Sequence, residues 1–186
     1  MEDSMKKRSA KTIFIETFLH LATHTDTDKI TTKRIVEDSG LSLQTFYNHF
    51  KNKEDLILKW HNSETEALMA GIGSRDYAFC DAMRDYLEFY KSHGDVILNL
   101  IKNTHGQFSF LNHIAESSCR IMSLHICQQR GTAKLPADLD IQLRVYVVGL
   151  INIYPEWLTK YADMPTDDFI ACLLDSAPEA LKPYLR

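Results

Sequence analysis

A short stretch near the N-terminus concentrates side chains that suit contact with a nucleic acid. Gln44 and Asn48 are four residues apart, so both amides lie on one helix face, where each can pair with the edge of an adenine. Such polar residues would also suit an ordinary surface helix, and the pattern alone leaves that alternative open. Four neighbouring side chains are better placed to hold phosphates, which fix register without reading sequence: Thr45, Tyr47, His49 and Lys53.

Two short helices joined by a tight turn are needed to position these side chains. Gly40 stands where the turn requires a positive φ, and Ser42 is a favourable N-cap for a helix over about residues 43–50. Phe46 and Phe50, four residues apart, share the face of that helix opposite the amides. The spacing predicts a helix-turn-helix whose second helix enters the major groove of DNA.

The rest of the chain is also predicted to be helical, with few period-2 runs among its 186 residues. A first helix covers about residues 9–24, and a polar loop over residues 25–29 ends it. A connecting helix runs from about residue 52 to residue 70, and Gly71, Gly73 and Ser74 mark the turn after it. Further helices are predicted over residues 75–92, 96–103, 108–129, 138–161 and 166–174. The expected fold is all-α with about nine helices, divided into an N-terminal domain, 1–58, and a helical body, 59–186.

Charge and composition limit the classes of protein. The net charge of the chain is −4. Residues 1–60 hold 10 Lys and Arg against 9 Asp and Glu, so the excess of acidic residues lies in residues 61–186. Any DNA affinity must therefore come from local placement of Lys and Arg. No run of about 18 apolar residues and no secretory leader is evident, so we expect a cytoplasmic protein without membrane contact. The four cysteines have no C-x-x-C spacing and are expected to be reduced, with a redox role left open.

Signatures of catalysis and of metal binding are weak in this sequence. His20 and His24 are four residues apart and could share a metal, but no third ligand accompanies them. His113, Cys119 and Cys127 spread over almost four helical turns and cannot converge on one ion. With no G-x-S-x-G, phosphate loop or paired carboxylates, we expect neither a cofactor nor an enzyme.

The helix-turn-helix residues resemble the DNA-binding domain of the tetracycline-repressor (TetR) family. The resemblance lies in three segments: Gly40-Leu41-Ser42, Thr45-Phe46-Tyr47-Asn48-His49-Phe50 and Lys51-Asn52-Lys53. It implies that Thr32 and Lys33 approach the DNA backbone, and that Leu43, Gln44 and Asn48 face base edges. It also implies that phosphates are held by Thr45, Tyr47, His49 and Lys53. Leu43 departs from the polar or small residue usual at its position and is expected to touch a thymine methyl.

The resemblance further implies a homodimer on a palindromic operator, with a small effector bound in the C-terminal body. Repression is the expected mode, and a co-activator acting through another regulator is the alternative. The residues themselves indicate a mainly apolar or aromatic effector. The candidate pocket residues are Tyr86, Phe89, Phe108, Asn112, His113, Tyr146, Asn152 and Trp157. Surplus apolar area on the last two helices predicts a dimer interface at Leu139, Leu143, Val147, Leu150, Phe169 and Leu173.

Overall fold

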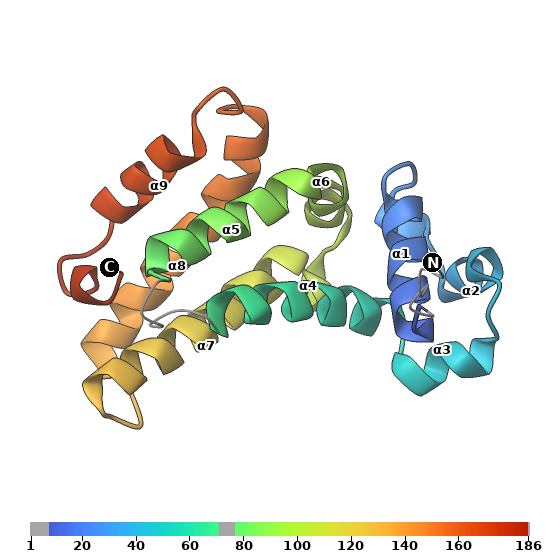
Figure 1. Ribbon diagram of the computed structural model, residues 1–186, viewed down its shortest axis with the longest axis horizontal. Coiled ribbons are helices and arrows are strands. Elements are labelled where there is room, and N and C mark those ends of the chain that lie inside the picture. The colour runs from blue at the N-terminus through green and yellow to red at the C-terminus, as the bar shows by residue number, and fades with distance from the viewer. Residues whose placement is uncertain (1–7, 71–76, 186) are drawn as a thin grey trace, which may run out of the picture.

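A computed structural model describes residues 8–70 and 77–185 of the chain. Within these ranges the regular elements are nine α-helices and three short 3₁₀ helices. Helices α1 (Ala10–Ala22), α2 (Thr32–Ser39) and α3 (Leu43–His49) form a small group at one end of the molecule, and α4 (Lys53–Ala70) runs from this group into a larger helical body (Figure 1). The all-α fold is therefore confirmed.

The ends of the helices in the N-terminal group are set by capping residues. The Thr12 N–H donates to Ser9 Oγ at 3.1 Å, which starts α1 one residue later than the sequence predicted. Gly40 ends α2 with φ +67°, a left-handed conformation that a side chain would strain. Ser42 Oγ accepts from the Thr45 N–H at 3.0 Å and starts α3. Local hydrogen bonding therefore sets the angle between α2 and α3.

The segment predicted as a polar loop, residues 25–29, contains a 3₁₀ helix, η1 (Thr27–Lys29). Thr27 in it is 1% exposed, although its neighbours are charged or polar. Its burial comes from a contact with Asn99, 72 residues further along the chain. The burial of Thr27 could not be predicted from the polar character of the loop, because the burying partner is distant in sequence.

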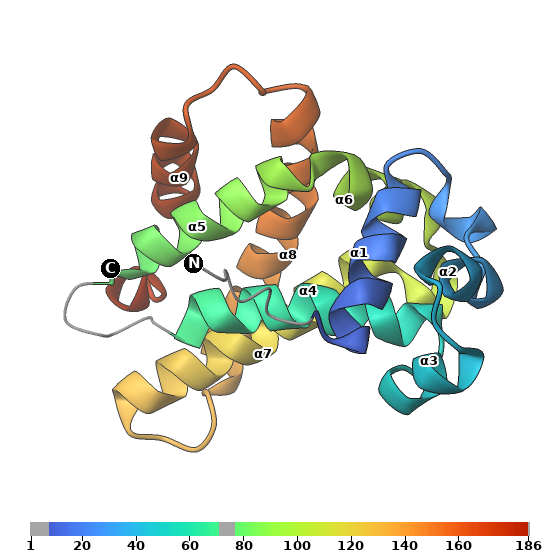
Figure 2. The same ribbon diagram turned by 45° about the vertical axis from the view of Figure 1, so that its right-hand side comes forward.

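The remaining helices form the body, into which the C-terminal part of α4 runs (Figure 2). They are α5 (Phe79–Ser92), α6 (Gly94–Asn103), α7 (Phe110–Arg130), α8 (Ala137–Thr159) and α9 (Thr166–Asp175), with 3₁₀ helices η2 (Gly106–Phe108) and η3 (Lys182–Tyr184). Gly131, at φ +64°, ends α7 and lets the chain turn back into α8. The predicted turn at Gly71, Gly73 and Ser74 lies outside the described residues.

Buried side chains form one continuous cluster that extends through both parts of the molecule. Phe14, Phe46 and Phe50 fill the N-terminal group, where the rings of Phe14 and Phe46 meet edge to face with centroids 5.1 Å apart. Trp60 of α4 continues this packing into the body through Phe89, 5.7 Å away between ring centroids. Among the described helices, none has the length and apolar character needed to cross a membrane.

Candidate DNA-binding surface and ligand cavity

Helix α3 separates an apolar inner face from a polar outer face. Phe46 is fully buried, whereas Leu43 is 49% and Tyr47 54% exposed. Gln44 and Asn48 are also exposed, and Gln44 Nε2 donates to Asn48 Oδ1 at 3.1 Å. This bond holds the two amides together while leaving one oxygen and further N–H groups for a partner. The amides predicted to read bases therefore form one preoriented unit on the solvent side.

The predicted phosphate-contacting residues differ in how freely they can move. Tyr47 is exposed, and Lys33 is exposed with a loose ion pair to Glu37 at 3.6 Å. Thr32, Thr45 and His49 are partly buried at the edges of the two helices. Thr45 Oγ1 lies 2.8 Å from Ser42 Oγ, so this hydroxyl also supports the start of α3.

Lys53 has an intramolecular contact that the sequence did not predict. Its Nζ donates to the Thr27 carbonyl at 2.6 Å, and burial lowers the pKa of this ammonium. Lys53 therefore connects the start of α4 to η1, and two of its three hydrogens remain for other acceptors. Lys59 was also missed: its Nζ donates to the His49 carbonyl at 2.9 Å and caps the C-terminus of α3.

A second polar contact joins the N-terminal group to α6 of the body. Asn99 Nδ2 donates to the Ala22 carbonyl at 2.7 Å and to the Thr25 carbonyl at 2.8 Å, so it satisfies groups left open at the end of α1. Its Oδ1 accepts from the Thr27 N–H at 3.0 Å. Together with Lys53, Asn99 places η1 between the two parts of the molecule. We refer to Asn99, Thr27 and Lys53 as the η1 contact.

The body contains a cavity of about 50 Å³ lined by residues of α4, α5, α7 and α8. This is several times the ~10–15 Å³ that a single water requires. Most of its wall is aliphatic or aromatic, as in small-molecule sites generally. The lining residues are His61, Thr65, Phe79, Ala82, Met83, Tyr86, Ser117, Ser118, Ile121, Met122, Val147, Leu150, Ile151 and Tyr154.

Two buried polar atoms in this wall have no hydrogen-bond partner among the described residues: His61 Nδ1 and Ser117 Oγ. His61 is 1% and Ser117 9% exposed. Burial lowers the pKa of His61 to about 4, so its ring is neutral near pH 7. Because buried polar groups are nearly always bonded, these two atoms mark a place where a bound molecule could supply partners.

Sequence reasoning overlooked His61 and Ser117, although a signal existed for the first. Ile57, His61 and Thr65 follow one another at four-residue intervals along α4, and all three are buried. This stripe is the face of α4 that meets the body. Because His61 and Thr65 are polar, their positions in this stripe indicated that they need hydrogen-bond partners inside the body.

Of the predicted pocket residues, the structure brings Tyr86 into the cavity wall and places the others elsewhere. Asn112 and Asn152 are exposed, and Asn152 Nδ2 bonds back to the Val148 carbonyl of its own helix at 2.8 Å. These two assignments were wrong. For Asn152 the reason is that the outer side of α8 is apolar enough to resemble an inner face.

The remaining predicted pocket residues pack within the body. His113 Nε2 bonds Asn62 Oδ1 at 3.1 Å, and the Tyr146 hydroxyl donates to the Leu173 carbonyl at 2.7 Å. Phe108 is partly buried against the core, as is Phe89 beside Trp60. Their polar atoms and rings already have protein partners, so they are structural neighbours of the cavity rather than its lining.

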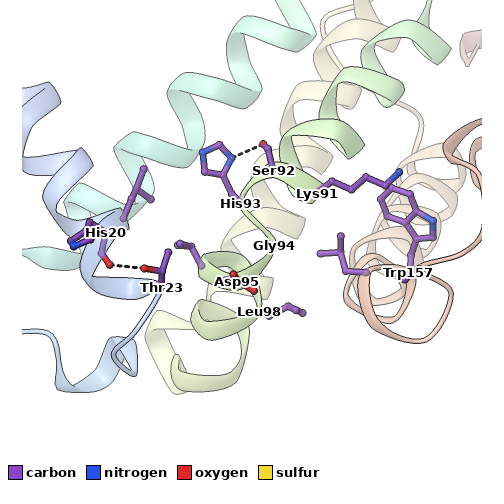
Figure 3. A pocket seen from close by; sticks show the side chains of 13 residues that line it. His20, Thr23, Lys91, Ser92, His93, Gly94, Asp95, Leu98 and Trp157 are labelled. Atoms are coloured by element: carbon purple, nitrogen blue, oxygen red, sulfur yellow. Dashed lines mark hydrogen bonds between the residues drawn. The ribbon is translucent and has the colours of Figure 1, made fainter.

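Trp157, the last of that set, lines a different and larger hollow of about 530 Å³ between α1, the α5–α6 junction and α8 (Figure 3). This groove is open to solvent. Trp157 Nε1 is buried without a hydrogen-bond partner among the described residues, whereas other polar groups of the groove are bonded. His93 Nδ1 lies 3.1 Å from the Phe89 carbonyl, and Lys91 Nζ donates to Thr166 Oγ1 at 2.8 Å. The smaller cavity, with two orphaned polar atoms on α4 and α7, is the candidate ligand site, and the groove lies between α1 and the body.

The predicted dimer-interface residues are buried within the protomer, so that assignment was wrong. All six are at most 7% exposed: Leu139, Leu143, Val147, Leu150, Phe169 and Leu173. The outer face of α8 instead presents Ile141, Val145 and Val148 at 61%, 70% and 46% exposure, and Leu124 of α7 is 60% exposed. Since α8 is apolar on both faces, its periodicity could not show which face packs inward. We call these four residues the α7–α8 patch.

Among residues 8–66 and 77–185, no cluster of three or more His, Cys, Asp or Glu side chains has an arrangement suited to a metal ion. His20 and His24 have ring centroids 5.9 Å apart on α1. The four cysteines are free thiols.

Comparisons with known proteins agree with this architecture. Residues 15–59 match the family described as bacterial regulatory proteins, tetR family. No match was found among curated protein sequences. Three solved structures share the fold over most of both chains. The dihydroxyacetone kinase operon activator DhaS is 15% identical with a TM-score of 0.64, covering 95% of this chain and 98% of its own.

The other two structures are similarly distant in sequence. A putative TetR-family transcriptional regulator from Syntrophomonas wolfei str. Goettingen is 14% identical with a TM-score of 0.58, covering 89% of this chain and 91% of its own. The fatty acid degradation regulator FadR from Bacillus halodurans is 12% identical with a TM-score of 0.58, covering 90% and 94%. At such identities the likeness concerns the fold alone.

The exposed face of α3 and the tight turn at Gly40 define a helix-turn-helix DNA-binding protein with a helical body. Together with the match over residues 15–59, this architecture supports a regulator of the TetR type, whose helix-turn-helix domain is the part that the family model covers.

Proposed function

We propose that this regulator is a homodimeric repressor that binds a palindromic operator and responds to a small, mainly apolar effector. The observation that carries the proposal is α4, which starts beside the recognition helix α3 and lines the cavity with His61 and Thr65. Residues 1–58 would form the DNA-binding domain, and residues 59–186 the effector-binding and dimerisation domain. Such a bacterial protein would meet its operator in the cytoplasm and need no catalytic activity.

The DNA contacts are proposed from the exposed side of α2 and α3. Leu43, Gln44 and Asn48 face base edges, and the amide pair suits adenine. Backbone phosphates are contacted by Thr32, Lys33, Thr45, Tyr47, His49 and Lys53. Because the body carries a net negative charge, the affinity for DNA depends on these local contacts, and it falls steeply as the salt concentration rises.

The dimer is proposed to form through the α7–α8 patch. Large exposed apolar side chains on two adjacent helices are costly in water, and packing against the same helices of a second copy would remove them from solvent. A twofold arrangement also presents two α3 helices to one operator. Successive major grooves on one side of B-DNA are about 34 Å apart, so the dimer must hold that spacing.

Effector control is proposed to act through α4 and the η1 contact. A molecule that enlarges the cavity displaces the segment of α4 that carries His61, and Lys53 at the other end of α4 is bonded to Thr27. Asn99 anchors Thr27 to α6, so the N-terminal group follows the body rather than moving freely. The spacing between the two α3 helices would then change.

The test is salt-dependent binding of the purified protein to DNA from its own promoter. We expect binding by a dimer, with an affinity that falls as salt rises and exceeds that for random DNA by at least about 10³-fold. Equal affinity for both DNAs would contradict the proposal and favour the alternative, a co-activator that reaches promoters through another regulator. The description of DhaS as an operon activator shows why the fold cannot fix the sign of regulation.

A further inference from the structure

The buried polar atoms of the cavity carry information about the molecule that binds there. Tyr86, Tyr90 and His61 form a chain of hydrogen bonds inside the body, from α5 to α4. The Tyr86 hydroxyl donates to the Tyr90 oxygen at 2.8 Å, and the Tyr90 oxygen lies 3.2 Å from His61 Nε2. With Tyr86 donating to it, the Tyr90 hydroxyl keeps its own hydrogen to donate, and we take His61 Nε2 as the acceptor within its reach.

This chain fixes the tautomer of His61. A neutral imidazole carries one hydrogen, and if Nε2 accepts, that hydrogen is on Nδ1. The neutral form is favoured because burial lowers the pKa of this ring to about 4. His61 Nδ1 is therefore a hydrogen-bond donor, and it is one of the two orphaned atoms in the cavity wall. The cavity offers an N–H that lacks an acceptor.

Ser117, on α7, provides the second orphaned group. A buried helical serine commonly bonds back to a carbonyl of the preceding turn, but Ser117 Oγ has no partner among the residues that the structure describes. Its hydroxyl can donate or accept. The buried polar atoms of the wall without a partner among the described residues are thus one donor and one adaptable hydroxyl.

The remainder of the wall disfavours charge. Phe79, Met83, Ile121 and Leu150 are among the side chains that surround these two atoms. An ion transferred into such surroundings loses hydration that two neutral hydrogen bonds do not replace. A molecule with a compact apolar frame loses nothing of this kind. An aromatic ring needs more than the about 50 Å³ of the cavity, so its binding must widen the cavity, as the proposed displacement of α4 requires.

We infer that the effector is a compact, uncharged molecule with an oxygen acceptor, a carbonyl or hydroxyl oxygen, that bonds to His61 Nδ1–H, while Ser117 provides a second polar contact. This inference rests on the proposed function, because it names the class of effector to which the regulator responds. It excludes carboxylates and pure hydrocarbons as preferred ligands.

The tautomer is tested first, on the wild-type protein without ligand or DNA. Two-dimensional proton–nitrogen NMR of protein labelled with ¹⁵N-histidine distinguishes the protonated ring nitrogen from the bare one. We expect the hydrogen of His61 on Nδ1. A hydrogen on Nε2 would make Nδ1 an acceptor and overturn the inference.

Ligand class is tested by calorimetric titration with three probes of similar size: acetophenone, ethylbenzene and benzoate. Acetophenone carries the oxygen acceptor, ethylbenzene lacks it, and benzoate is an anion. We expect acetophenone to bind about fivefold more tightly than ethylbenzene, the worth of about one net hydrogen bond, and benzoate to bind most weakly. Equal binding of acetophenone and ethylbenzene, tightest binding of benzoate, or no binding of any probe would each refute the inference.

The site is tested with Ser117→Ala and a matched control, Ser123→Ala, on the same helix but outside the cavity wall. Ser117→Ala should lower the affinity for acetophenone several-fold and leave the affinity for ethylbenzene unchanged. Ser123→Ala should change neither affinity. Equal effects of the two substitutions would place the ligand elsewhere. These titrations contain no DNA, so failure of the protein to bind promoter DNA is a separate result. That failure would contradict the proposed function but not the ligand site.

Discussion

At the scale of single residues, the recognition surface depends on the amide pair of α3. Gln44 and Asn48 bond each other at 3.1 Å, which fixes their orientation before DNA arrives and lowers the entropy lost on binding. Tyr47 beside them is exposed but has no such constraint. We therefore expect sequence discrimination to reside in the amide pair, and affinity without discrimination in the surrounding phosphate contacts.

Substitution Gln44→Ala tests the role of this pair in base recognition. It should weaken binding to the cognate operator by about 1–3 kcal/mol and leave binding to random DNA unchanged, because a bidentate base contact is lost but no phosphate contact. Fluorescence anisotropy on both DNAs measures the effect, and Gln128→Ala on the surface of α7 is the control. Equal losses on all sequences would mean that Gln44 does not read bases.

His61 predicts a pH dependence of stability. Burial lowers its pKa to about 4 in the folded protein, against about 6.5 in the unfolded chain. Between these values the unfolded chain binds a proton that the folded protein does not, so the free energy of unfolding falls as pH drops from 6.5 to 4, by about 3 kcal/mol in total. Burial also lowers the pKa values of His113 and His125, which contribute in the same direction.

Urea unfolding of wild type and His61→Phe at pH 4.5 and pH 7 measures this contribution. The variant should lose less stability between the two pH values than wild type does, because it has no ring to protonate. The exposed His105→Phe change is the control and should retain the wild-type difference. Identical pH differences in wild type and His61→Phe would contradict the assignment.

At the scale of helices, the η1 contact joins the DNA-binding part to the body. Asn99 satisfies two carbonyls at the end of α1 and the Thr27 N–H, three groups that lie between the two parts. A coupling that passes through one short 3₁₀ helix can be weakened by a single substitution. This makes Asn99 a positioning residue for α1 and η1.

Substitution Asn99→Ala should lower the free energy of unfolding by about 2 kcal/mol, because it leaves partly buried donors and acceptors without partners. Hydrogen exchange should speed up at the Thr27 amide, which loses its acceptor. Urea unfolding and exchange monitored by NMR give both quantities. The control is Asn152→Ala, at an exposed amide that bonds within its own helix, and it should change stability by less than about 0.5 kcal/mol. A similar small effect at Asn99 would rule out the role given to it.

Most helices could be predicted from sequence because local signals define their ends. Ser42 and Gly131 are examples, since the hydroxyl and the left-handed glycine act within a few residues. What escaped prediction depends on distant partners. Thr27 is buried by Asn99, His61 faces Tyr90, and the inward side of α8 is selected by the helices packed on it. The exposed polar face of α3 could be predicted from sequence, whereas the cavity and the α7–α8 patch could not.

At the scale of the whole molecule, the α7–α8 patch predicts the assembly. Val145, 70% exposed, lies near the middle of the outer face of α8. Substitution Val145→Glu should convert the dimer to a monomer, because two copies of the new carboxylate would face each other across a twofold interface. Light scattering after size-exclusion chromatography gives the mass. Ala171→Glu, at an exposed position on α9, should leave the dimer intact. A dimer that survives Val145→Glu would place the interface elsewhere.

The most direct measurement of the central claim is hydroxyl-radical footprinting of the protein on promoter fragments selected by their binding to it. If two α3 helices of one dimer enter successive major grooves, protection should appear over two inverted half-sites whose centres are about 10 base pairs apart, or a multiple of that spacing. Gln44→Ala should lose this pattern at concentrations where wild type shows it. Protection of a single half-site, or uniform protection without sequence preference, would contradict the account.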